Sequence, residues 1–178
     1  MKPTKTVADS LNIPFTYLKQ PPRRYTFQMP QVKRWVEQTV EGKVLNLFAG
    51  MVSMNCDEVR VDLDPTAPAD YHMDAYDFVE QWKGKPFDSV IFDPPYNLRK
   101  SRELYGGRYI GSLTKIKNIL PRIIKAGGIV ISFGYDTTGM SKSRGFAKEG
   151  ICLINHSGDH NDTLVVVERK IIHAEIGL

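Results

Sequence analysis

The sequence has little cysteine, no long apolar segment and no group of residues with metal-ligand spacing. Its 178 residues include only two cysteines, Cys56 and Cys152, which lie far apart. Neither a disulfide framework nor a zinc site is therefore predicted. His156 and His160 stand in a polar connection between two predicted strands, and we assign no metal to them. Without a bilayer-length apolar run or an apolar signal segment after the N-terminus, we expect a cytoplasmic protein that does not enter a membrane.

A glycine-rich dinucleotide fingerprint is also absent. Residues 43–50 read as an apolar strand that runs into Phe48-Ala49-Gly50. Ligands of parallel sheets bind at the carboxyl ends of strands, where a glycine lets the backbone come close to the ligand. The chain continues Met51-Val52-Ser53 and so lacks Gly-x-Gly-x-x-Gly, which argues against a nicotinamide-dependent dehydrogenase.

Charge is distributed unevenly along the chain, although the net charge is only +4. Residues 44–98 carry three Lys or Arg and ten Asp or Glu, whereas residues 99–148 carry eleven and two. An acidic segment followed by a strongly basic one indicates two surfaces with different partners. The basic segment favours a polyanion such as nucleic acid.

A short apolar run, residues 87–92, ends abruptly in Asp93-Pro94-Pro95-Tyr96. The run predicts a buried strand, which two consecutive prolines must end because neither donates a backbone hydrogen bond. This combination suits chemistry on the exocyclic amino group of a nucleobase, which is a poor nucleophile until its nitrogen becomes tetrahedral. The Asp93 carboxylate and the Pro94 carbonyl supply two acceptors for the two N–H bonds, and Tyr96 supplies a ring on which the base stacks.

Asp93-Pro94-Pro95-Tyr96 resembles the motif of the DPPY class of S-adenosylmethionine-dependent amino-methyltransferases. These enzymes act on adenine N6, cytosine N4 or, in some RNA enzymes, guanine N2. The resemblance implies S-adenosylmethionine as cofactor and all four motif residues as the catalytic group. Residues 47–50 are similar to the cofactor loop of the same class, although the usual second glycine is missing.

The resemblance also implies a set of cofactor-binding residues. Asp62 fits the position that binds ribose hydroxyls, with Asp64 as its rival, and the Asp74-Ala75 pair resembles the segment that meets the adenine amino group. The complete predicted set is Phe27, Asn46, Phe48, Ala49, Gly50, Asp62, Asp74, Ala75 and Asp93.

Basic and aromatic residues alternate just after the motif, which predicts a loop that grips phosphates and stacks on bases and that closes as a lid. The predicted substrate-binding residues are Tyr96, Asn97, Arg99, Lys100, Arg102, Tyr105 and Arg108.

The remaining pattern alternates strands with helices and predicts a single α/β domain, residues 29–178, preceded by an N-terminal arm, residues 1–28. The arm is interpreted either as a nucleic-acid contact or as a strap over the core. A helix over residues 112–125 is expected to kink at Pro121 and to end at Gly127-Gly128. The resulting fold class is Rossmann-like class I methyltransferase, with a mostly parallel seven-stranded sheet and a terminal antiparallel hairpin.

The predicted function is methylation of an exocyclic amine in RNA, specifically cytosine N4 of ribosomal RNA, which is favoured slightly over adenine N6. The predicted partner is ribosomal RNA or the small ribosomal subunit. RNA is favoured over DNA because the insertion after the motif is short, whereas DNA amino-methyltransferases normally add a target-recognition region. The cytosine preference follows from similarity to compact archaeal-type ribosomal RNA cytidine methyltransferases. The alternatives are an adenine-N6 or cytosine-N4 DNA enzyme, a guanine-N2 RNA enzyme, a protein glutamine methyltransferase, and a non-catalytic partner subunit that binds the cofactor. The sequence is compatible with a monomer.

Overall fold

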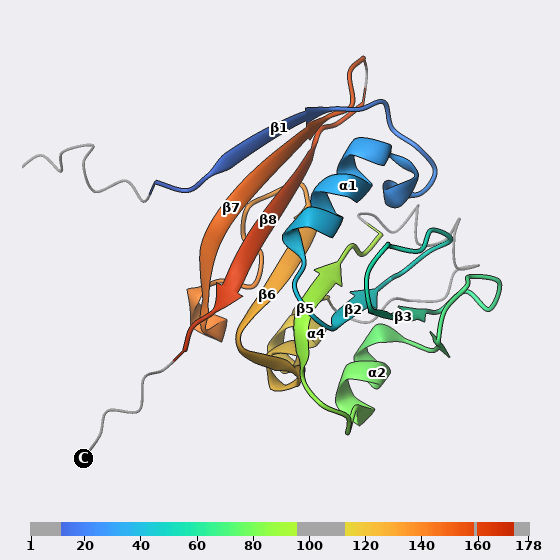
Figure 1. Cartoon of the computed structure of the whole chain (residues 1–178), viewed down its shortest axis with the longest axis vertical. Coiled ribbons are helices and arrows are strands. Elements are labelled where there is room, and N and C mark those ends of the chain that lie inside the picture. The colour runs from blue at the N-terminus through green and yellow to red at the C-terminus, as the bar shows by residue number, and fades with distance from the viewer. Residues whose placement is uncertain (1–11, 96–112, 159, 173–178) are drawn as a thin grey trace, which may run out of the picture.

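The computed structural model describes residues 12–95, 113–158 and 160–172, which form a mixed sheet with helices packed on it (Figure 1). The strands are β1 (Phe15–Lys19), β2 (Val44–Leu47), β3 (Glu58–Asp62), β4 (Tyr71–His72), β5 (Phe87–Phe92), β6 (Ile124–Gly134), β7 (Phe146–Asn155) and β8 (Thr163–Lys170). The α-helices are α1 (Pro30–Thr39), α2 (Ala75–Gln81) and α4 (Leu113–Ile119). Three short 3-10 helices are η2 (Thr26–Gln28), η3 (Leu120–Ile123) and η4 (Lys142–Arg144).

The sheet has the order β1-β7-β8-β6-β5-β2-β3-β4. Every neighbouring pair is parallel except those of β8, which runs antiparallel to both β6 and β7. The predicted fold class, a mostly parallel sheet with a terminal antiparallel hairpin, is confirmed. The described residues form eight strands, however, and not seven.

The order of the strands reverses beside β2. The chain runs from β2 to β3 and β4 on one side, then returns to form β5 and β6 on the other. Val44 to Leu47 consequently pair with strands on both sides and are all buried. In open parallel sheets, ligands bind outside the carboxyl ends of the strands at such a reversal. The topology therefore points to the ends of β2 and β5 before any side chain is considered.

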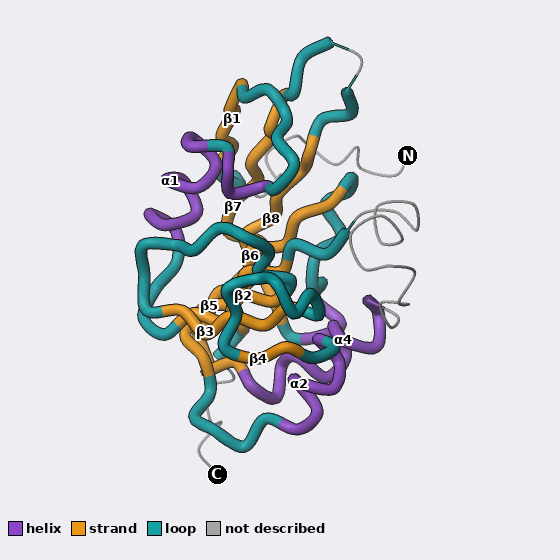
Figure 2. The backbone as a smooth tube through the Cα atoms, turned by 90° about the vertical axis from the view of Figure 1, so that its right-hand side faces the viewer, coloured by secondary structure: helices purple, strands orange, loops and turns teal. Residues whose placement is uncertain are grey.

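Two apolar cores cover the two faces of the sheet, because the helices that connect parallel strands pack on both faces. Val32 and Val36 of α1 belong to one core, together with residues of β6, β7 and β8. Phe78 of α2 and Ile116 of α4 belong to the other core. Figure 2 shows α1 on one side of the strands and α2 and α4 on the other.

The expected kinked helix over residues 112–125 is wrong. Helix α4 ends at Ile119, and Pro121 lies in η3, because proline lacks the N–H and its ring clashes with the carbonyl four residues earlier. Strand β6 begins already at Ile124. Gly127 and Gly128 do not end a helix but lie within β6, where its register against β5 shifts.

The segment expected to be an N-terminal arm contributes a strand. β1 forms the edge of the sheet, parallel to β7, with Phe15 opposite Ile151 and Lys19 opposite Asn155. After β1 the backbone N–H of Gln20 donates to the carbonyl of Asn155 at 3.0 Å. The chain then passes through η2 into α1, so residues 20–29 are held at both ends. In the described part of the chain, no helix is long and apolar enough to cross a membrane.

Candidate active site

One cleft opens at the carboxyl ends of β2, β3 and β5, where the topology places it. Its lining consists of residues from the segment before α1, the loop after β2, the end of β3 and the end of β5. These residues are Arg24, Tyr25, Thr26, Phe27, Phe48, Ala49, Gly50, Met51, Val52, Asp62, Asp64, Ala67, Asp93, Pro94 and Pro95. Most of the predicted cofactor and catalytic residues within the described ranges are therefore brought together.

The loop after β2 turns sharply at Phe48 and Gly50, which have φ angles of +63° and +60°. The turn aims the N–H of Gly50 back at β3, where it donates to Oδ2 of Asp62 at 2.7 Å. The Phe48 ring meets the Phe92 ring edge-on, with 5.5 Å between ring centroids. The loop after β2 thus contacts the ends of β3 and β5 and lines the cleft between them.

Replacing Gly50 by alanine is expected to lower the free energy of unfolding by about 1–2 kcal/mol, because residues with a Cβ are strained at a positive φ. An added Cβ would also lie 3.4 Å from Cδ1 of Tyr25, across the cleft. Chemical denaturation measures the loss in the free energy of unfolding. Gly150→Ala is the matched control, since Gly150 is not among the glycines with positive φ and its added Cβ would lie 3.7 Å from Val167. Equal losses in the two variants would contradict the proposed strain.

The two candidate ribose acids have different environments. Asp62 is buried, with 3% of its surface exposed, and its Oδ1 accepts the N–H of Asp64 at 2.8 Å while its Oδ2 accepts Gly50. The Asp64 carboxylate accepts hydrogen bonds from the backbone N–H and from the hydroxyl of Thr66. These two hydrogen bonds, chiefly the first, hold the pKa of the Asp64 carboxyl below its usual range. Both carboxylates line the cleft. Asp62 is the more rigidly fixed of the two.

Sequence reasoning missed Arg60, which lies on β3 with only 6% of its surface exposed. Its guanidinium donates to the carbonyls of Ala49 (3.3 Å), Gly50 (2.9 Å) and Val52 (2.8 Å) in the loop after β2, and to that of Pro68 at 2.6 Å. The guanidinium also pairs with Glu58 at 2.8 Å. Residues 48–57 contain no helix, so Arg60 supplies the donors that fix this loop.

Asn46 does not line the cleft, although the resemblance implied that it binds the cofactor. Its side chain is completely buried on β2, and its Nδ2 donates to Oε2 of Glu58 at 2.9 Å. Glu58 also accepts the N–H of Met54 at 2.8 Å. Asn46 therefore belongs to the support under the loop after β2, together with the Arg60–Glu58 pair.

Asp74 and Ala75 lie in a smaller pocket next to the main cleft. This pocket shares Phe48 and Asp62 with the cleft, so the two are adjacent. Oδ1 of Asp74 accepts the N–H of Tyr76 at 2.7 Å and thereby caps the start of α2. The cap fixes the direction of the carboxylate at the wall of this second pocket.

Asp93, Pro94 and Pro95 follow β5 directly and lie at the cleft. Ile91 and Phe92 pair with β2 on one side and β6 on the other, which fixes the point at which the strand ends. The other predicted substrate residues, Tyr96, Asn97, Arg99, Lys100, Arg102, Tyr105 and Arg108, lie outside the described residues.

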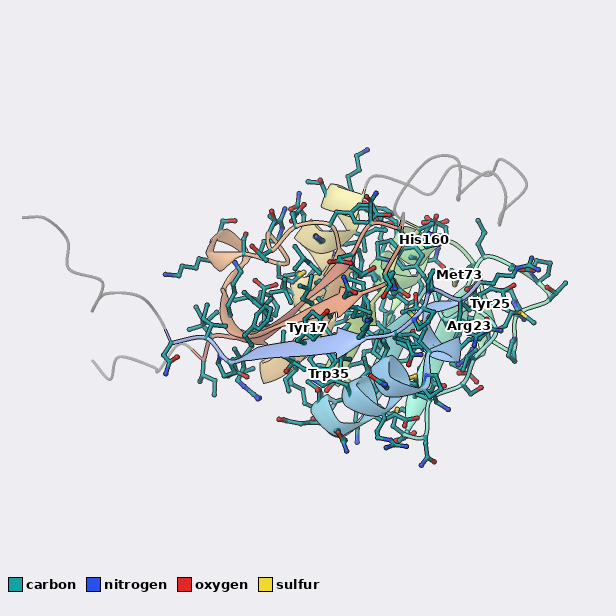
Figure 3. All side chains as sticks on the ribbon, turned by 90° about the horizontal axis from the view of Figure 1, so that it is seen from above. Tyr17, Arg23, Tyr25, Trp35, Met73 and His160 are labelled. Atoms are coloured by element: carbon teal, nitrogen blue, oxygen red, sulfur yellow. The ribbon has the colours of Figure 1, made fainter. Side chains whose placement is uncertain are left out.

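The remaining wall of the cleft comes from the N-terminal segment. Phe27 is 5% exposed and packs edge-on against Phe133, with 5.8 Å between ring centroids. The Arg24 guanidinium lies 5.4 Å from the centroid of the Tyr25 ring. Figure 3 shows Tyr25 beside Arg23, at the same end of the molecule as Met73 and His160. The described part of residues 1–28 is thus anchored to the core through β1 and Phe27 and lines the cleft.

The strand order, the reversal at β2 and the cleft beside it define the Rossmann-like fold of class I methyltransferases. Solved structures share this fold. TrmN from Thermus thermophilus superposes with a TM-score of 0.54 and 15% identity, over 80% of this chain and 49% of that one. A putative SAM-dependent methyltransferase from Streptococcus mutans superposes with a TM-score of 0.55 and 15% identity, over 78% of this chain and 48% of that one.

A third similar structure is the Pyrococcus abyssi tRNA (uracil-54, C5)-methyltransferase in complex with S-adenosyl-L-homocysteine. Its TM-score is 0.50 at 14% identity, over 78% of this chain and 37% of that one. The chain thus spans half or less of the length of these three proteins. No protein-family model and no curated protein sequence matches it.

Proposed function

We propose that the chain is an S-adenosylmethionine-dependent methyltransferase that acts on an exocyclic amino group of a nucleobase in RNA. The observation that carries the proposal is the position of Asp93, Pro94 and Pro95 in the lining of the cleft at the strand reversal. A motif suited to holding an amino group thus lines the same cleft as a loop suited to holding a nucleoside cofactor.

The cleft fits the charge of S-adenosylmethionine, which carries a sulfonium and an ammonium group. Three carboxylates, those of Asp62, Asp64 and Asp93, line it. Carboxylates attract such cations, most strongly where water is partly excluded. When bound, the cofactor supplies a methyl group that is activated by the positive sulfur.

Ribose and adenine recognition are assigned to Asp62 and to the Asp74-Ala75 pair. Each Asp62 oxygen accepts one backbone N–H and retains a second lone pair for a ribose hydroxyl. Adenine is proposed to lie against the wall that Asp74 and Ala75 form. Phe27, Phe48, Ala49 and Gly50 are assigned to the contact surface of the cofactor.

The acceptor side is assigned to the four motif residues. The Asp93 carboxylate and the Pro94 carbonyl accept the two N–H bonds of the substrate amine and draw its nitrogen towards tetrahedral geometry. Pro94 and Pro95 have restricted φ angles, which keeps the carbonyl in place without a cost in ordering. Tyr96 is assigned to stacking on the base. The proton leaves after methyl transfer, so no general base is assigned.

RNA is the proposed substrate, with cytosine N4 of ribosomal RNA as the specific target. The basic segment that follows the motif supports a polyanion. One of the structurally similar proteins is named as a tRNA methyltransferase, which supports RNA, although that enzyme methylates a carbon. A structured RNA can present one unpaired base to such a cleft.

The proposal is tested by incubating the purified chain with labelled S-adenosylmethionine and, separately, ribosomal RNA, tRNA, duplex DNA and a release factor. Mass spectrometry of the digested nucleosides then identifies the product. N4-methylcytidine in ribosomal RNA is the expected result, and excess S-adenosylhomocysteine should suppress it. Label in DNA alone or in the release factor alone would reject RNA as the substrate. Absence of label from all four, with the cofactor bound, would reject methyl transfer by the isolated chain.

A further inference from the structure

A second groove lies beside the cleft, also at the carboxyl ends of the parallel strands. Arg23, Arg24 and Thr26 line it from the segment before α1, and Tyr135 lines it directly after β6. His156 and His160 line it from the connection between β7 and β8. Because β6 and β7 run in the same direction as β5, their carboxyl ends reach the edge at which Asp93 lies.

The groove continues into the cleft, because Arg24 and Thr26 line both. The two hollows differ in charge. Three carboxylates line the cleft, whereas no carboxylate lines the groove in the part of the chain that the structure describes. An extended ligand whose one end enters the cleft would therefore meet a basic path on leaving it.

The arginines of the groove are available to a ligand. Arg23 and Arg24 are both exposed. Among the described residues Arg23 forms no ion pair with a carboxylate, whereas Arg24 lies over the Tyr25 ring and contributes to the lowered pKa of Asp64 in the cleft. Their guanidinium groups carry donors that match phosphate oxygens. An exposed arginine in a groove that no described carboxylate lines favours a polyanionic ligand.

Aromatic surface lies beside these charges. Tyr135 is 48% exposed, a large share for a ring that lines a groove. His156, which also lines the groove, is 7% exposed, and its two ring nitrogens contact the Gln20 carbonyl at 3.0 Å and the Thr163 hydroxyl at 2.9 Å. His156 thus ties the N-terminal segment to the connection between β7 and β8 and keeps the two walls together. Arginines with an exposed ring match a nucleic-acid strand, whose phosphates and bases alternate.

We propose that this groove binds the single RNA strand that flanks the target nucleotide, with Arg23 on a phosphate and Tyr135 against a base. The inference rests on the proposed function, since it is the assigned target site that places the strand here. It adds a second contact surface, built from the N-terminal segment and the β7–β8 connection, to the basic segment that follows the motif.

The experiment measures binding of a short fluorescein-labelled oligouridine by fluorescence anisotropy over a series of salt concentrations. Arg23→Glu is expected to weaken binding about tenfold at low salt and to reduce the slope of log K against log salt by about 0.7, the value for one phosphate contact on a single strand. Lys148→Glu is the matched control, because Lys148 is exposed near the amino end of β7, whereas the groove lies at the carboxyl end of that strand. It should bind like the parent chain.

Binding of S-adenosylhomocysteine, measured by calorimetry, separates the two proposals and verifies that each variant is folded. If the parent chain binds oligouridine and Arg23→Glu binds equally well, the groove proposal is wrong while the methyltransferase proposal stands. If the parent does not bind oligouridine, the groove proposal is also wrong. If Arg23→Glu weakens binding but no RNA is methylated by the parent, the groove stands and the proposed function fails.

Discussion

Asp93→Ala is expected to reduce the rate of methyl transfer about 100- to 1000-fold, the range typical of removing one preorganised group that stabilises a transition state. The variant loses one of the two acceptors proposed to hold the substrate amine, while the Pro94 carbonyl remains. Single-turnover assays with RNA and labelled S-adenosylmethionine measure the rate. Asp93→Asn, which keeps one carbonyl acceptor but loses the charge, is expected to lie between the parent and the alanine variant.

A control for lost negative charge is Asp77→Ala. Asp77 is exposed in the first turn of α2 and does not line the cleft. Its variant should methylate RNA at the parental rate. Calorimetry with S-adenosylhomocysteine shows whether the Asp93 variants still bind the cofactor product. Full turnover by Asp93→Ala with the cofactor bound would show that the amine is held by some other group.

Arg60→Met is expected to lower the free energy of unfolding by about 3–5 kcal/mol, the loss typical of removing one partner from a buried ion pair. The side chains of Arg60 and Glu58 are each only 7% exposed. Without Arg60, Glu58 is left with a buried charge, and the carbonyls of the loop after β2 lose their donors. Urea denaturation followed by circular dichroism measures the loss.

Two further variants separate the buried charge from the lost loop contacts. Arg60→Met combined with Glu58→Gln removes the unpaired charge and is expected to recover part of the stability. Lys43→Met disrupts the pair with Asp57, whose side chains are 43% and 71% exposed, and should cost less than about 1 kcal/mol. If Arg60→Met also lowered the free energy of unfolding by less than about 1 kcal/mol, Arg60 would not support the loop after β2.

The strands that carry the cleft could be predicted because their signals are local. Residues 44–47 and 87–92 are apolar runs, and Gly50 and Pro94 mark where the chain leaves the sheet. Their parallel pairing, and therefore the position of Phe48 and Asp93 at one cleft, follows from the alternation of strands and helices. Local sequence thus predicted the fold class and most of the cleft.

The support of the cleft could not be predicted in this way. Arginine is almost never fully buried unless it is paired, so a strand pattern gives no reason to place Arg60 inside. Its partners lie at residues 49–52, 58 and 68, and only the folded arrangement brings their oxygens together. Strand β1 was missed for a similar reason, because a five-residue edge strand is specified by its pairing with β7 rather than by its own composition.

The pairing of β1 with β7 also bears on the order in which the molecule folds. Phe15 lies opposite Ile151, and the contact between His156 and Gln20 spans 136 positions in the sequence. Contacts this distant close a long loop and form late when the chain folds. During synthesis on the ribosome, β7 emerges long after β1, so Arg24, Tyr25 and Phe27 cannot be held in place until most of the chain has been made. Nascent chains should therefore complete the cleft only after β7 has been made and has paired with β1.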